Sequence, residues 1–211
     1  MPELHIITGS NGAGKSTVGS DYLPGYITKN LQIFNGDKLF QDKQKELWKQ
    51  GMRAIKELKN ISYEFVTTTF DALTEAALNN SANFAYEGHF TNEATWDVPR
   101  KFKAAGYSIH LVFFGLNDPE LSQLRVVDRA KEGGHYVSSV EVEANFYGNL
   151  EKLNQHFEMF DTVQVVDTSE TEHLVLRTFT NGSVHSYIPY NKLPEWFGEH
   201  LSNMAYKIPA I

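Results

Sequence analysis

The chain of 211 residues is 41% hydrophobic and 21% charged, with a formal net charge of −7. This length fits one α/β domain with a substantial core and excludes a typical two-domain enzyme. The acidic balance disfavours a nucleic-acid partner, because phosphate contacts need clustered Lys and Arg. The absence of cysteine excludes disulfides, thiolate metal sites and a cysteine nucleophile. No apolar run reaches the length of a membrane span, so we expect a cytoplasmic protein with no membrane partner.

The N-terminal segment combines a strand pattern with a phosphate-binding motif. Residues 4–8 are apolar and β-branched, which predicts a short strand. Residues 9–16 then match G-x-x-x-x-G-K-[ST], and a helix is predicted to begin at Lys15. In this motif backbone N–H groups surround the phosphates, Lys15 reaches the β- and γ-phosphates, and the Ser16 hydroxyl binds Mg²⁺. The predicted nucleotide-binding residues are Gly9, Ser10, Asn11, Gly12, Ala13, Gly14, Lys15, Ser16 and Thr17.

The rest of the chain alternates between helix and strand patterns. Helices are predicted over residues 15–23, 38–60 with a break near Gly51, 69 or 71 to 78, 93–105, 118–131, 140–159 and 195–201. Strands are predicted over residues 31–34, 82–86, 107–116, 162–167, 174–180 and 183–188, the last two joined by an Asn181-Gly182 turn. This order predicts a three-layer α/β sandwich with a central parallel sheet and a C-terminal β-hairpin.

Polar residues follow two of the predicted strands, where open α/β sheets carry their working residues. Asp37 could accept the proton of an attacking hydroxyl, or it could cap the next helix. Glu87 could face a phosphate acceptor or hold a magnesium-bound water, or it could be a solvated turn residue. His89 is expected on the polar rim of the substrate site. No pair of the eight histidines shows the HExxH spacing, so no histidine metal site is predicted.

Arg125 and Arg129 lie one helical turn apart on a predicted helix, and Gly133-Gly134-His135 follows them. This arrangement suits a mobile lid whose two arginines stabilise the charge of a transferring phosphate. The alternative is ordinary surface pairing with Asp128 and Glu132.

These motifs together resemble zeta-toxin-like kinases, and in particular the branch often labelled predicted ABC-type ATPases. The resemblance covers about residues 3–170. It is carried by residues 8–17, Asn35-Gly36-Asp37, Tyr86-Glu87-Gly88-His89-Phe90, Arg125-Val126-Val127-Asp128-Arg129 with Gly133-Gly134-His135, and Val166-Asp167-Thr168-Ser169.

The resemblance implies a P-loop kinase-like domain over residues 1–170, with residues 171–211 packed on it as a hairpin and short helix. It implies ATP or GTP with Mg²⁺ as cofactors, Asp37 as base, Lys15, Arg125 and Arg129 as further catalytic residues, and Glu87 near the acceptor. Zeta toxins phosphorylate a hydroxyl of UDP-N-acetylglucosamine, which makes a nucleotide sugar the implied acceptor class.

Two features qualify this assignment. His89 replaces a small hydroxyl residue of related zeta toxins, and the long helix reads Ala144-Asn145-Phe146-Tyr147 where the branch usually has an arginine. An antitoxin is an implied partner, although only eight residues precede Gly9 to pack against one. Two hypotheses remain: a phosphotransferase acting on a small hydroxyl-bearing molecule, and a nucleotide-binding ATPase or switch without efficient kinase activity.

Overall fold

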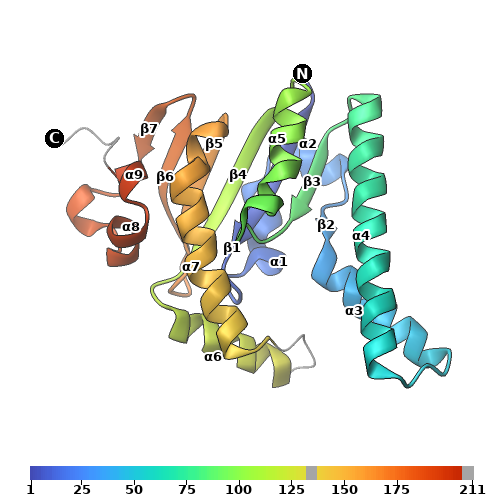
Figure 1. The fold of residues 1–211 in the computed structure, drawn as a ribbon. Coiled ribbons are helices and arrows are strands. Elements are labelled where there is room, and N and C mark those ends of the chain that lie inside the picture. Colours follow the sequence, from blue (N-terminus) through green and yellow to red (C-terminus); the bar gives the residue numbers. More distant parts are fainter. Residues whose placement is uncertain (132–136, 206–211) are drawn as a thin grey trace.

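The structure, a computed structural model, describes residues 1–131 and 137–205 (Figure 1). Its strands form one seven-stranded sheet in the order β2-β3-β1-β4-β5-β6-β7. The first five strands of this order are parallel, and β6 and β7 extend the sheet as antiparallel strands. The strands are β1 (Glu3–Gly9), β2 (Phe34–Asn35), β3 (Phe84–Glu87), β4 (Ser108–Gly115), β5 (Thr162–Asp167), β6 (Leu174–Thr180) and β7 (Ser183–Ser186).

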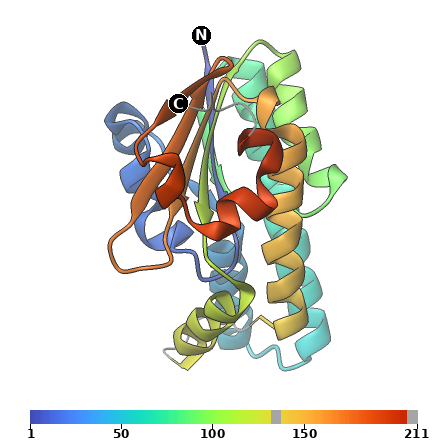
Figure 2. The same cartoon turned by 90° about the vertical axis from the view of Figure 1, so that its left-hand side faces the viewer.

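Helices cover both faces of the sheet, which confirms the three-layer α/β sandwich (Figure 2). None of the described helices is long and apolar enough to cross a membrane. The α-helices are α1 (Lys15–Val18), α2 (Gly25–Asn30), α3 (Gly36–Lys49), α4 (Ile55–Asn80), α5 (Asp97–Ala104), α6 (Pro119–Lys131), α7 (Ser139–His156), α8 (Glu195–His200) and α9 (Ser202–Ala205). Short 3₁₀ helices are η1 (Gly19–Tyr22), η2 (Glu93–Trp96), η3 (Phe157–Met159) and η4 (Tyr190–Lys192).

The helices lie in front of the sheet, behind it, beyond its β2 edge and beyond the ends of its strands. In Figure 1, α5 and α7 lie in front of the sheet, whereas α1 and α2 lie behind it. The helices α3 and α4 pack against each other beyond the β2 edge. The helix α6 lies near α1, beyond the carboxyl ends of the parallel strands. The phosphate-binding motif, the start of α3 and the arginines of α6 therefore come together at the carboxyl ends of the parallel strands.

The C-terminal hairpin is confirmed and continues the main sheet. Asn181 and Gly182 both have positive φ, 46° and 83°, as the mirror-image hairpin turns require. The hairpin strand β6 pairs antiparallel with β5, so the hairpin adds two strands to the sheet that carries the motif.

One predicted helix boundary is wrong. We expected a new helix to begin at Thr69 or Asp71, but α4 runs without interruption through both residues. The Thr69 hydroxyl donates to the Phe65 carbonyl at 2.6 Å, inside the same helix. A hydroxyl that bonds back to its own helix does not cap a new one. The predicted break near Gly51 is confirmed, and Gly51 has a φ of +97°.

The segment after the phosphate-binding motif also differs from the prediction. Instead of one helix over residues 15–23, α1 has four residues and is followed by η1. Pro24 precedes α2, because its fixed φ suits a helix start, and α2 buries Ile27. The strand predicted over residues 31–34 shrinks to β2, because Leu31 ends α2. The short α1 also means a smaller helix dipole at the motif than a nine-residue helix would give.

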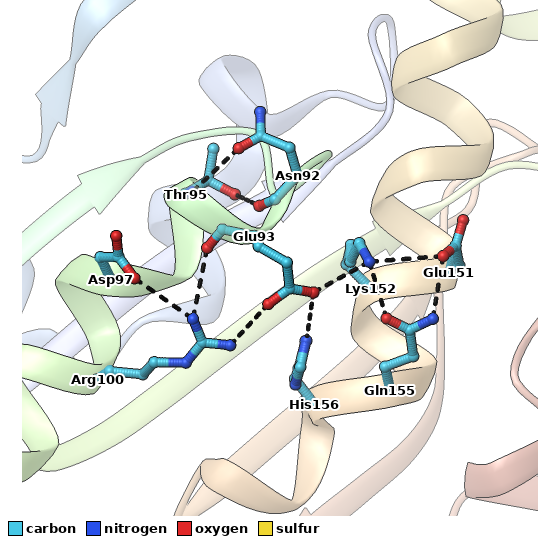
Figure 3. A network of polar contacts seen from close by, with 9 residues as sticks. All are labelled: Asn92, Glu93, Thr95, Asp97, Arg100, Glu151, Lys152, Gln155 and His156. Carbon is cyan, nitrogen blue, oxygen red and sulfur yellow. Dashed lines mark hydrogen bonds and ion pairs between the residues drawn. The ribbon is translucent and has the colours of Figure 1, made fainter.

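A surface network of polar contacts ties η2 and α5 to α7 (Figure 3). The Glu93 carboxylate lies 2.8 Å from Arg100 Nη2, 3.0 Å from Lys152 Nζ and 3.1 Å from His156 Nε2. The His156 ring in turn packs 4.8 Å from the Trp96 ring. We call these four polar residues, Glu93, Arg100, Lys152 and His156, the Glu93 network. It fixes α7 against the layer formed by η2 and α5.

Candidate active site

The phosphate-binding motif forms a tight loop between β1 and α1, and glycine is needed at two of its positions. Gly9 has a φ of +136°, and a Cβ atom there would lie 2.2 Å from the Phe114 carbonyl oxygen. Gly12 has a φ of +72°, and its Cβ would lie 2.9 Å from the Cβ of Arg125. A side chain at either position would clash and strain the backbone. The local packing thus explains glycine at both positions, of which the motif itself specifies only Gly9.

Contacts from three distant segments hold the loop in place. Ser122 Oγ of α6 donates to the Asn11 carbonyl at 2.6 Å. Asn145 Nδ2 of α7 donates to Asn11 Oδ1 at 2.8 Å. Thr168 Oγ1, just after β5, donates to the Ala13 carbonyl at 3.1 Å. Such bracing reduces the ordering that the loop must undergo when a ligand binds.

Lys15 is the buried cation of the loop. Its side-chain ammonium donates to the Gly9 carbonyl at 2.9 Å and to the Ser10 carbonyl at 2.8 Å. Burial lowers the pKa of Lys15 to about 8, although the carboxylates of Glu87 and Asp37 act in the opposite direction. The protonated form therefore lacks sufficient compensating charge in this environment. An anionic ligand would supply that charge.

Ser16, Glu87 and Asn35 form an oxygen-rich cluster at the start of α1. Ser16 Oγ donates to the two carboxylate oxygens of Glu87 at 2.8 and 2.9 Å. Asn35 Nδ2 donates to Glu87 at 2.7 Å and to Ser16 Oγ at 3.1 Å. Burial raises the pKa of Glu87, and the nearby Lys15 charge opposes that rise. Hydroxyl and carboxylate oxygens are the ligands that Mg²⁺ prefers, so the residues present fit this ion.

Asp37 lies between two adjoining cavities at the carboxyl ends of the parallel strands. The first, of about 390 Å³, extends over the phosphate loop, and the second, of about 440 Å³, extends toward Lys38 and Gln41 of α3. The residues that line both cavities are Lys15, Ser16, Asp37, Glu87 and Arg129. The structure therefore brings together the predicted lysine, serine, both carboxylates and one of the two arginines.

The alternative interpretation of Asp37 as a helix cap is wrong. Asn35 caps α3 instead, because its Oδ1 accepts a hydrogen bond from the Lys38 backbone N–H at 2.9 Å. Asp37 lies in the first turn of α3 with its side chain exposed to solvent. Its carboxylate is thus available to a ligand in either cavity.

The two arginines of α6 are placed differently, although both line the cavity over the phosphate loop. The Arg125 guanidinium donates to the carbonyls of Thr168 and Ser169, both at 2.7 Å, and more weakly to Gly12 at 3.4 Å. It therefore joins α6 to the phosphate loop and to the end of β5. Arg129 lines both cavities, and its charge acts on Lys15 and on Glu87. The predicted hinge at Gly133-Gly134-His135 lies outside the described residues.

His89 lies beside the phosphate loop, but it is not among the described residues that line these two cavities. Burial lowers the pKa of His89 well below its usual value, and the Lys15 charge acts in the same direction. The ring contacts Asn149 Nδ2 at 3.3 Å, and Asn149 Oδ1 accepts from the Phe90 backbone N–H at 2.7 Å. A neutral His89 thus helps α7 to hold the loop after β3.

Several residues of the site were not among the predicted site residues. Asn35 belongs to the Asn-Gly-Asp motif, and its position just before Asp37 was the available signal. Thr168 follows β5 in the Val-Asp-Thr-Ser motif, which gave a similar signal. Asn145 lies in the stretch of the long helix where the branch usually has an arginine, which was its signal. Ser122 had none, because it contacts a loop residue more than 100 positions away in the chain.

The sheet order and the braced glycine loop define the class of protein as one with the P-loop kinase fold. The chain belongs to the zeta toxin family, whose model matches residues 1–178. No curated protein sequence matches the chain.

Solved structures share this fold at low sequence identity. A chain from the PezAT chromosomal toxin–antitoxin system of Streptococcus pneumoniae is 18% identical with a TM-score of 0.59, covering 100% of this chain and 88% of that one. A chain of the AvrRxo1-ORF1:AvrRxo1-ORF2 complex, solved with sulphate ions and also with ATP, is 16% identical with a TM-score of 0.71, covering 96% and 64%. A putative kinase from Chloroflexus aurantiacus is 14% identical with a TM-score of 0.54, covering 95% and 96%.

Proposed function

We propose that this chain is a P-loop phosphotransferase that moves the γ-phosphate of ATP to a hydroxyl of a small molecule. The observation that carries the proposal is the position of Asp37 on the wall shared by two cavities. An ATPase or a switch needs a cavity for the nucleotide, whereas a transferase also needs a second cavity for the acceptor. A base is then required between the two, and Asp37 meets that requirement.

In the proposed reaction, Asp37 accepts the proton of the acceptor hydroxyl while that oxygen attacks the γ-phosphorus. A new bond forms between the acceptor oxygen and phosphorus, and the bond from phosphorus to the β–γ bridging oxygen breaks. The products are ADP and a phosphomonoester. The site holds no residue that must form a covalent intermediate, so positioning and electrostatics supply the rate.

The other residues of the site have separate proposed roles. The loop amides and Lys15 hold the β- and γ-phosphates, and Arg129 stabilises the charge of the transferring group. Arg125 is a positioning residue that keeps α6 on the phosphate loop. Ser16 and Glu87 would hold Mg²⁺, which when bound neutralises charge on the β- and γ-phosphates.

A nucleotide sugar is the acceptor class that we propose to test first. The second cavity shares Ile33, Asn35 and Lys38 with a larger cavity of about 730 Å³ between β2 and α4. The space beside Asp37 could take a sugar ring, and the larger cavity could take the rest of a nucleotide sugar. Lys38 at their junction offers a cation for a diphosphate.

The test is an activity screen of the purified chain with ATP, Mg²⁺ and a panel of metabolites that includes nucleotide sugars. Mass spectrometry should find one acceptor that gains a phosphoryl group while an equal amount of ADP forms. The Asp37→Asn protein is the control and should leave that acceptor unmodified. ADP release without any phosphorylated acceptor would instead support the ATPase hypothesis.

The likeness to a chain of a toxin–antitoxin system supports a second test, of toxicity. Induced expression in a bacterial host should arrest growth, and Lys15→Ala should abolish the arrest if phosphoryl transfer causes it. Growth arrest by both proteins would separate toxicity from the nucleotide site. If the wild-type chain arrests growth, an antitoxin can be sought as a co-expressed protein that relieves the arrest.

A further inference from the structure

A second group of side chains that could bind a metal lies near the amino ends of β1 and β4, at the end of these strands opposite the phosphate loop. Glu3 and His5 are two residues apart on β1, so their side chains are on the same face of the sheet. His110 of β4 pairs in register with His5 and therefore shares that face. The parallel register thus brings two imidazoles and a carboxylate together from positions more than 100 residues apart.

The distances within this group are those of a compact ligand set. His5 Nε2 lies 3.0 Å from Glu3 Oε2. The rings of His5 and His110 are stacked, with centroids 4.8 Å apart and an interplanar angle of 21°. One ligand atom from each of the three residues lies within 4.8 Å of the others. Two ligands of a tetrahedral zinc ion with bonds of about 2.0–2.1 Å are about 3.3 Å apart, so the longest gap must close by about 1.5 Å. At least one of the stacked rings must also rotate, because an imidazole nitrogen binds a metal in the plane of its ring.

A neighbouring tyrosine holds the carboxylate of this group in place. Tyr26 Oη lies 2.7 Å from Glu3 Oε2 and orients the carboxylate as outer partners of metal ligands do.

From this geometry we propose that Glu3, His5 and His110 bind one Zn²⁺ ion, with a fourth position open to water. Two imidazoles and a carboxylate select zinc-like transition metals over Mg²⁺, which prefers oxygen alone. The bound ion links β1 to β4, the two strands at the centre of the sheet. The site is separate from the phosphate loop, which follows the other end of β1.

The experiment uses the full chain without a histidine tag, in excess Mg²⁺ so that oxygen-only sites are filled. Calorimetry with Zn²⁺ should give one site per chain, and Co²⁺ in its place should give the visible absorption of a tetrahedral ion. His110→Gln should weaken Zn²⁺ binding by roughly 100-fold, at least the effect of losing an outer partner. The matched control is His185→Gln, which removes an exposed imidazole from β7 and should leave the affinity unchanged.

A milder variant covers the case in which His110→Gln fails to fold. Tyr26 is 53% exposed, so Tyr26→Phe should fold normally and weaken Zn²⁺ binding by roughly 10-fold through the lost hydrogen bond to Glu3. The proposal is overturned if the wild-type chain shows no saturable Zn²⁺ binding. It is equally overturned if His110→Gln or Tyr26→Phe binds Zn²⁺ as tightly as the wild type, because the ion would then lie elsewhere.

Discussion

Two groups of charged residues in this molecule show opposite effects of their surroundings. In the Glu93 network, three basic groups surround one exposed carboxylate and lower the pKa of Glu93 to about 2. Hydrogen bonds with Glu93 in turn raise the pKa values of Arg100 and Lys152. Each of these charges stabilises its partner. The network is complete within the protein itself.

The phosphate-loop cluster, consisting of Lys15, Asp37, Glu87 and Arg129, differs in this respect. Burial lowers the pKa of Lys15 to about 8 and raises that of Glu87, so both charged forms are disfavoured. Ligand charges are what this cluster lacks, because phosphates would compensate Lys15 and a cation would compensate Glu87. Charges that stabilise one another thus fasten helices here, whereas the buried charges of Lys15 and Glu87, which their surroundings disfavour, mark the site that awaits a ligand.

The largest effect should come from removing the buried cation. Lys15→Ala should lower ATP affinity by roughly 10³-fold, because two charge-assisted hydrogen bonds to the phosphates are lost. Titration calorimetry measures the loss, and circular dichroism checks that the fold is intact. Lys49→Ala, at the exposed end of α3, is the matched control and should bind ATP normally. Unchanged ATP binding by Lys15→Ala would show that the phosphate loop is not the ATP-binding site.

Slightly smaller changes, in transfer rate and ATP affinity, should distinguish the roles of the two arginines of α6. Arg129→Ala should reduce the transfer rate by roughly 10²- to 10³-fold, the effect of losing one donor to transition-state charge, with a much smaller change in ATP affinity. Arg125→Ala should lower both rate and affinity, because its contacts with the Thr168 and Ser169 carbonyls position the loop. Steady-state kinetics and calorimetry together make the distinction. Normal turnover by Arg129→Ala would support the alternative interpretation, in which this arginine only forms ordinary surface pairs.

The stability of the nucleotide-free chain should reveal the cost of burying Lys15. The folded pKa of about 8 lies below the ordinary value of 10.5. The unfolded chain therefore binds more protons between these values, and wild-type stability gains from a rise in pH across that range. Lys15→Met should be more stable than the wild type by up to about 3 kcal/mol at pH 7, from 1.36 kcal/mol per pKa unit. Urea unfolding should show this advantage shrinking from pH 8 to 10.5, and a constant difference would contradict it.

The smallest effect is expected in the Glu93 network, because its central carboxylate is 56% exposed and ion pairs in contact with solvent contribute little. Glu93→Gln should leave phosphoryl transfer unchanged and reduce stability only slightly at pH 7. The lowered pKa of Glu93 means that its contribution is present above about pH 4.5 and is lost as the pH falls toward 2. Thermal unfolding of both proteins should therefore converge at low pH. A large loss of activity in Glu93→Gln would show that the network also controls the site.

The parts of the fold that depend on neighbouring residues could be predicted from the sequence. The phosphate loop and the Asn181-Gly182 turn have local rules, since both require positive φ at fixed positions. The continuous helix through Thr69 could not be predicted, because whether a hydroxyl caps a helix or bonds back to it depends on the surrounding backbone. The same limit applies to α2, whose start at Pro24 reads equally well as a helix end.

The candidate site divides in the same way. Lys15 and Ser16 follow from the motif, and Asp37 and Glu87 follow from their places after strands. The role of Arg125 does not follow from its spacing with Arg129, because three carbonyl groups distant in sequence accept its hydrogen bonds. The pairing of His5 with His110 was equally hidden, because only the sheet register brings the two rings together.

The central claim is that Asp37 serves the acceptor and not the nucleotide, and one variant tests it directly. Asp37→Asn should bind ATP with wild-type affinity and transfer phosphate roughly 10²-fold more slowly or worse, the usual effect of losing a general base. Both quantities are to be measured on one preparation, with Asp71→Asn on α4 as the matched control. Wild-type turnover by Asp37→Asn would contradict the account, and so would a loss of ATP binding equal to the loss of rate.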